Sequence, residues 1–148
     1  MSVRTFCFCL LGCATLVLSS LAGCGAKDPL GRKAISGSVT LNGSPVEQGN
    51  IMFEPVGTAA VTSSGSVITA GKFAIEQEFG LPPGKFVVRI NVPKPGTGGT
   101  FDANTLPGVM LEPPEEMAPP DWNTNSKQSI EVKPDGPFEY NFDIKAKK

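Results

Sequence analysis

The feature that most constrains the fold of this chain is an alternation of apolar and polar side chains with a period of two residues. It is clearest in residues 85–92, where alternate positions hold Phe86, Val88, Ile90 and Val92. Alternate residues of a β-strand point to the same face of a sheet, so this pattern predicts a strand with one buried face. The same reasoning predicts strands at residues 35–41, 50–54, 66–69, 72–76, 129–132 and 138–144.

Turn signals separate these stretches, and no stretch after residue 24 places apolar residues at helical spacing. Asn42-Gly43 favours a tight hairpin because both residues tolerate positive φ, and Lys133-Pro134-Asp135-Gly136 is a second turn. About seven short strands joined by such turns predict an all-β fold, a single β-sandwich. The predicted core consists of inward-facing residues of these strands: Val39, Phe53, Phe73, Phe86, Val88, Ile90, Tyr140 and Phe142.

The first 23 residues have the layout of a secretory signal peptide. Arg4 precedes an apolar run at residues 5–18, and a segment rich in small residues, 19–23, leads to Cys24. The apolar run is shorter than the roughly 20 residues that a membrane-spanning helix needs, and no stop-transfer sequence follows it. An exported chain is therefore predicted in preference to a membrane-spanning one.

The end of this segment, Leu21-Ala22-Gly23-Cys24, resembles the lipobox of bacterial lipoproteins. The resemblance implies that the thiol of Cys24 carries a diacylglyceryl group, that a peptidase cleaves between Gly23 and Cys24, and that Cys24 becomes the mature N-terminus. A rival motif, Leu10-Leu11-Gly12-Cys13, would leave an apolar region too short for export and has a bulky leucine where a small residue is usual. The other alternative is that Cys24 follows a standard cleavage site by coincidence.

The same resemblance predicts where the protein resides. A lipoprotein of this kind is anchored to a membrane of the bacterial cell envelope by two or three acyl chains, which suffice for stable binding. Gly25, rather than aspartate, follows the cysteine, and by the rule of this family that favours the outer membrane in a cell with two membranes. All four cysteines lie within the first 24 residues, so the mature chain would keep one, for lipid rather than for a disulfide or a metal.

Composition excludes several classes of function for the mature chain. The sequence contains no histidine, which removes histidine-based acid–base catalysis, Ser-His-Asp sites and nearly all zinc and copper sites. Residues 1–23 hold one of the 13 basic residues and none of the 14 acidic ones, so the mature chain has a small negative balance. That balance does not favour binding to nucleic acid. We therefore predict a protein that is not an enzyme and that binds no metal and no cofactor.

Two stretches of the mature chain resemble the carboxypeptidase regulatory-like, transthyretin-like domains common in bacterial envelope lipoproteins. The matching segments are Gly37-Ser38-Val39, Asn42-Gly43-Ser44-Pro45-Val46, Gly71-Lys72-Phe73-Ala74-Ile75 and Pro83-Gly84-Lys85-Phe86-Val87-Val88. The resemblance implies a Greek-key β-sandwich and is nearly silent on activity. One enzymatic branch of the transthyretin-like fold relies on histidines, which excludes that branch here.

The mature chain divides into a short tether and one domain. Residues 24–33 comprise the lipidated cysteine and a segment without periodicity, and residues 34–148 form the β-sandwich domain. Within this domain, residues 93–127 form a loop that is too long for an ordinary sandwich connection and holds half of the 14 prolines. Loops of this length are usually functional or disordered, so the candidate ligand contacts are sought in it.

Four residues of this loop are candidate ligand contacts: Trp122, Asp121, Glu115 and Glu116. The Trp122 ring can stack on a sugar or plug the edge of the sandwich, and we predict the plug. The acidic residues, together with Glu112 and with Asp102-Ala103-Asn104, contain oxygen ligands for calcium, but their spacing matches no known calcium loop and favours a solvated acidic face. Gly96-Thr97-Gly98-Gly99 lacks the helix start of a phosphate-binding loop and is predicted to be a hinge.

Three functional hypotheses follow. The first is a non-enzymatic, lipid-anchored envelope protein that acts as a structural, adhesion or scaffold module, with another envelope protein or a cell-surface polysaccharide as its partner. The second is a carbohydrate- or peptide-binding module that uses Trp122 and the acidic loop. The third and weakest is a hydrolase that uses two carboxylates, because a proline-rich loop is a poor place to hold the fixed separation that glycoside hydrolysis requires.

Overall fold

The computed structural model describes residues 28–57, 62–98 and 112–146, and over these ranges the chain is all-β. The predicted signal peptide, Gly23 and Cys24 lie outside the described residues. Eight strands and two single turns of 3₁₀ helix make up the described secondary structure. None of the helical turns in this part of the chain is long and apolar enough to cross a membrane.

The strands and turns are short and follow one another closely. Their bounds are β1 Ile35–Leu41, β2 Ser44–Pro45, β3 Gln48–Pro55, β4 Ser64–Thr69, β5 Lys72–Ile75, η1 Gln77–Phe79, β6 Gly84–Asn91, η2 Pro120–Trp122, β7 Ser129–Val132 and β8 Glu139–Ile144. All seven predicted strands are present. The two-residue β2 is additional, and β3 and β4 are longer than predicted because their ends pair with each other and with β6.

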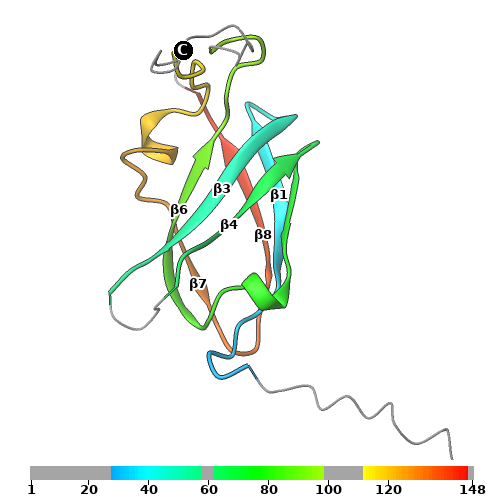
Figure 1. Ribbon diagram of the computed structural model, residues 1–148, viewed down its shortest axis with the longest axis vertical. Helices are drawn as coiled ribbons and strands as arrows, with labels where there is room; N and C mark the ends of the chain where they lie inside the picture. Colours follow the sequence, from blue (N-terminus) through cyan, green and yellow to red (C-terminus); the bar gives the residue numbers. More distant parts are fainter. Residues whose placement is uncertain (1–27, 58–61, 99–111, 147–148) are drawn as a thin grey trace, which may run out of the picture.

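The eight strands form one sheet in the order β2-β1-β5-β4-β3-β6-β7, and β8 pairs with β1. Every pairing is antiparallel except that of β1 with β8, which is parallel and places Val39 opposite Phe142. Strands β4 and β5 share a single residue pair, Thr69 with Lys72, so the sheet folds at the hairpin between them. As a result it curls around a common core, as the ribbon shows (Figure 1).

The core lies inside this curled sheet, between the strands on either side of the β4–β5 hairpin. The rings of Phe53 on β3 and Phe73 on β5 are 6.0 Å apart, and Phe73 stacks on Phe142 of β8 at 6.2 Å. Buried apolar side chains line this contact: Ile35, Val39, Val46, Ile51, Phe53, Ile68, Phe73, Ile75, Leu81, Phe86, Val88, Ile90, Val92, Ala118, Val132 and Ile144. Six of the eight predicted core residues are among them.

The other two predicted core residues, Tyr140 and Phe142, pack against the core but are only half-buried. Both lie on β8, which pairs with β1 on one side alone, so their rings face the gap between β8 and β7. The Tyr140 hydroxyl donates a hydrogen bond to the carbonyl of Glu131 on β7, at 3.2 Å. The face of β8 that points toward the core was therefore predicted correctly. The prediction that Tyr140 and Phe142 are fully buried was wrong.

The domain has two ends, which are called here the entry end and the far end. The described chain begins at the entry end, where the backbones of Lys33 and Leu81 exchange hydrogen bonds of 2.9 and 3.1 Å. Strand β1 then runs toward the far end over seven residues, a distance of roughly 20 Å at about 3.3 Å per residue. At the far end the chain turns through Asn42-Gly43, where φ values of 52° and 86° confirm the predicted tight turn (Figure 1).

Candidate binding groove

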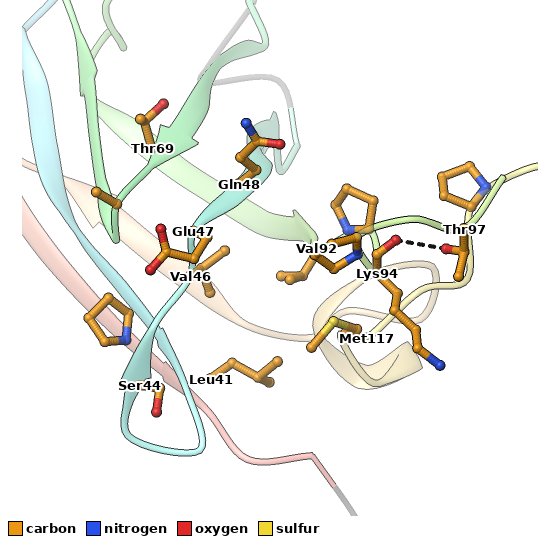
Figure 2. A pocket seen from close by; sticks show the side chains of 15 residues that line it. Leu41, Ser44, Val46, Glu47, Gln48, Thr69, Val92, Lys94, Thr97 and Met117 are labelled. Atoms are coloured by element: carbon orange, nitrogen blue, oxygen red, sulfur yellow. Dashed lines mark hydrogen bonds between the residues drawn. The ribbon is translucent and has the colours of Figure 1, made fainter. Parts of the chain in front are cut away.

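An open groove of about 670 Å³ lies at the far end of the domain (Figure 2). One wall comes from the turn between β1 and β3 and from the hairpin between β4 and β5; the other comes from the segment that follows β6. Most of the lining is apolar, and four of its residues are prolines: Pro45, Pro93, Pro95 and Pro114. The lining residues therefore come from four separate parts of the sequence.

The wall after β6 is formed by two segments that pair with each other. The N–H of Lys94 donates to the carbonyl of Glu115 at 2.7 Å, and the N–H of Met117 donates to the carbonyl of Val92 at 2.8 Å. The Thr97 hydroxyl donates to the Lys94 carbonyl at 2.7 Å, as the dashed line in Figure 2 shows. The two backbone bonds join residues 92–94 to residues 115–117 in a short two-stranded wall, and the Thr97 bond closes a turn within the first segment.

The Glu116 carboxylate ties this wall to the end of β6. Its Oε1 accepts hydrogen bonds from the backbone N–H groups of Val92 at 2.6 Å and Ala118 at 2.9 Å. Its Oε2 accepts from the side-chain amides of Asn91 at 2.8 Å and Asn123 at 3.1 Å. These four hydrogen bonds engage both carboxylate oxygens, so Glu116 stabilises the position of the loop against β6.

The opposite wall is held by backbone bonds between neighbouring turns. The N–H of Val46 donates to the carbonyl of Val39 at 3.1 Å, and the N–H of Gly71 donates to the carbonyl of Val46 at 2.7 Å. Gly71 has a φ of +73°, and a Cβ at this position would lie 2.7 Å from the Cβ of Pro45. Glycine is therefore required for Pro45 to close against the β4–β5 hairpin.

The C-terminal end of β8 also supports this wall. The N–H of Asn42 donates to the carbonyl of Ile144 at 2.8 Å, and the Asn42 side-chain Oδ1 accepts from the N–H of Ala146 at 3.0 Å. These two bonds hold the β1–β2 turn, and with it Leu41 and Ser44 of the groove, against the last strand. Hydrogen bonds within the chain thus hold both walls in place.

Six residues that line the groove are polar: Ser44, Glu47, Gln48, Thr69, Lys94 and Thr97. Lys94 is paired with Glu115, with Nζ and Oε2 2.8 Å apart, and this pair is largely exposed. Ser44 and Lys94 lie on opposite sides of the groove in Figure 2. No group of three or more Cys, Asp or Glu side chains that could hold a metal ion occurs within residues 28–57, 62–98 and 112–146. The groove therefore combines a mostly apolar lining with polar side chains on several of its segments.

The structure places Trp122 against the core, as the plug interpretation predicts. Its ring meets the ring of Phe142 nearly edge-on, with centroids 6.2 Å apart and an interplanar angle of 76°. The segment that follows is fixed by Arg89 of β6, whose Nη1 donates to the carbonyls of Asn123 at 2.6 Å and Thr124 at 2.8 Å. Trp122 therefore lies at the side of the sheet that β7 and β8 leave open.

The four candidate ligand contacts do not converge on one site. Glu116 and Asp121 line a separate, more open hollow of about 480 Å³, which Trp122 does not line. Glu115 is engaged with Lys94, at the rim of the groove. Glu112 is exposed, and Asp102 and Asn104 lie outside the described residues.

Sequence reasoning did not find the groove. Its residues belong to turns and to the ends of strands, where the two-residue alternation stops, and no motif joins them. The only available signal was the spacing of Pro93, Pro95 and Pro114 around the long loop, which marked this segment as unusual without showing what it packs against.

None of the protein-family models, curated proteins and solved structures compared with this chain matches it. The resemblance to carboxypeptidase regulatory-like domains stays a prediction. The groove is consequently interpreted from its own geometry.

Proposed function

We propose that this protein is a lipid-anchored, non-enzymatic component of the bacterial cell envelope that binds an apolar segment of another envelope protein in its groove. In this proposal the Cys24 thiol carries a diacylglyceryl group, a peptidase cleaves between Gly23 and Cys24, and the domain is a Greek-key β-sandwich of the carboxypeptidase regulatory-like type. The observation that carries it is the position of the groove. The groove lies at the far end of the domain, whereas the described chain begins, four residues after Cys24, at the entry end.

The chemistry of the lining favours an apolar peptide segment over a sugar. Sugars are held by several polar groups and by aromatic faces, and no aromatic side chain is among the residues that line the groove. Prolines supply no backbone N–H and have little freedom to lose, so a proline-lined wall contacts apolar surface with a small ordering cost. Met117, which is 40% exposed, adds a flexible apolar contact at the rim.

The second hypothesis, a sugar site at Trp122, has less support. A stacking platform needs an exposed ring face, but Trp122 is half-buried against Phe142. Glu116, which was a candidate contact of that site, already accepts four hydrogen bonds from the protein itself. The hydrolase hypothesis would require two free carboxylates among Glu112, Glu115, Glu116 and Asp121 in one pocket. Only Glu116 and Asp121 line the same hollow, and Glu116 already accepts four hydrogen bonds from the protein.

The anchor is tested by mass spectrometry of the protein purified from its membrane fraction. We expect an N-terminal peptide that begins at Cys24 and is heavier by at least a diacylglyceryl group. A matched Cys24→Ser variant should lack the added lipid mass. An unmodified Cys24 in the wild-type protein would contradict the anchor.

The groove is tested by photo-crosslinking in intact cells. A benzophenone amino acid replaces Met117 in one strain and Met52 in another; Met52 is 50% exposed and lies on the outer face of β3, away from the groove. We expect a discrete adduct from position 117 only, whose partner peptide is apolar, and we expect it to be weakened by Leu41→Asp. Identical adducts from both positions would refute a specific groove ligand.

A further inference from the structure

Two exposed apolar side chains mark the entry end of the domain. Phe79, the last residue of η1, is 65% exposed, and Leu30, near the start of the described chain, is 38% exposed. Both belong to segments that lie at the end where the described chain begins (Figure 1). A single exposed apolar side chain is common on a protein surface, whereas apolar side chains that gather in one patch mark a contact site.

Arg32 holds these two segments together. Its Nε lies 3.0 Å from Oδ2 of Asp28, and its Nη1 donates to the carbonyl of Glu78, the residue before Phe79. Asp28 in turn accepts the backbone N–H of Leu30 at 3.2 Å. The positions of Leu30 and Phe79 are thus linked through one guanidinium group, which gives the apolar pair a fixed spacing.

η1 is also attached to the sheet from its other side. The Ser64 hydroxyl of β4 donates to the carbonyl of Phe79. The next residue, Gly80, is buried, and a Cβ there would lie 2.1 Å from the carbonyl oxygen of Lys33. The backbone of the chain entry therefore packs directly against the η1 turn, so Phe79 is presented outward from a rigid support.

The length of chain between Cys24 and the domain limits how far the entry end can lie from the membrane. Cys24 and Asp28 are four residues apart, and four extended residues span at most roughly 14 Å. If Cys24 is acylated, as proposed above, its backbone lies at the bilayer surface. The entry end is then held within that distance of the lipid headgroups, while the groove lies on the other side of the domain.

We propose that Phe79 and Leu30 dock into the interface of the membrane that holds the lipid anchor, and thereby orient the domain with its groove away from the bilayer. This inference rests on the proposed acylation of Cys24. The contact is apolar and not electrostatic, because the charges nearby are mixed: Arg32 is paired with Asp28, Lys33 lies over the Phe138 ring at 5.6 Å, Glu76 precedes η1 and Glu78 lies within it. Anionic lipid is therefore not required.

The test uses the processed, full-length lipoprotein in phosphatidylcholine vesicles. Phe79→Cys introduces a thiol for a nitroxide spin label, and Val67→Cys is the matched control, because Val67 is 63% exposed but lies on the outer face of β4. Power saturation then compares the access of oxygen, which concentrates in lipid, with that of a water-soluble nickel chelate. We expect the label at position 79 to favour oxygen several-fold more than the label at position 67.

The outcomes separate this inference from the anchor proposal. One label per chain shows that the Cys24 thiol is blocked, and equal or reversed oxygen preference at the two positions would then overturn the membrane contact while the anchor stands. Two labels per chain would show that Cys24 is free and would overturn both. Addition of Leu30→Ser to the Phe79→Cys protein should lower the oxygen preference, and an unchanged value would exclude Leu30 from the contact.

Discussion

The Trp122 ring packs edge-on against Phe142, so a residue of the long loop closes the side of the sheet that β7 and β8 leave open. The two residues come from segments on opposite sides of β7 in the sequence. Their contact connects a loop that carries one wall of the groove with the last strand, which supports the other wall. The stability of the domain and the shape of the groove are thus coupled through one aromatic pair.

Substitution of Trp122 tests this contact. Because its ring is half-buried, Trp122→Ala should lower the free energy of unfolding by about 2 kcal/mol, roughly half the cost of deleting a fully buried aromatic side chain. Tryptophan emission of the wild-type protein should be blue-shifted and should not respond to added oligosaccharides. Red-shifted emission that responds to a sugar would instead support a platform at Trp122.

Neighbouring carboxylates should differ sharply in their effect on stability. Glu116→Ala removes the acceptor of four hydrogen bonds and should cost about 2 kcal/mol, since bonds to a charged acceptor are among the stronger ones. Glu115→Ala removes an exposed ion pair and should cost less than about 1 kcal/mol, with a dependence on salt. Urea denaturation of both variants measures their free energies of unfolding. Equal losses in the two variants would mean that the hydrogen bonds of Glu116 do not stabilise the loop.

The parallel pairing of β1 with β8 depends on Gly37. A Cβ at this position would lie 1.7 Å from the carbonyl oxygen of Tyr140, so Gly37→Ala must push the two strands apart and should cost at least about 3 kcal/mol. Gly43→Ala is the control: the site is open but has a φ of +86°, so strain of about 1 kcal/mol is expected. Thermal unfolding compares the two, and a mild effect of Gly37→Ala would contradict the observed register.

Acid should loosen the entry end. The side-chain hydrogen bond from Arg32 holds the pKa of the Asp28 carboxyl below its usual value. A carboxyl whose pKa is lowered in the folded state contributes stability above its unfolded pKa, near 3.9, and loses that contribution as the pH falls through the folded value. The stability difference between the wild type and Asp28→Asn should therefore shrink as the pH falls from about 3.9 through the lowered pKa of folded Asp28. A difference that does not shrink as the pH is lowered would exclude ionised Asp28 as its source.

Much of the fold was predictable from local patterns. The alternation in residues 85–92 identified β6 and its buried face, because a side-chain period of two is a property of any strand. The Asn42-Gly43 turn was predictable for a similar reason, since its φ values depend on two residues alone. The groove could not be predicted in this way. Its walls come from segments that are far apart in the sequence and share no periodicity or motif.

Local patterns in the amino-acid sequence were enough to predict that the described chain is all-β, where its strands lie and which faces they bury, because backbone dihedral preferences and side-chain alternation act over a few residues. The folded domain was needed to establish that β8 pairs in parallel with β1, that Tyr140 and Phe142 stay half-buried, and that both oxygens of Glu116 accept hydrogen bonds from the chain itself. Each of these depends on groups that are distant in sequence or on which edge of the sheet remains unpaired. Such contacts are selected by the packing of the whole domain, in which a side chain meets partners that its neighbours in sequence do not specify.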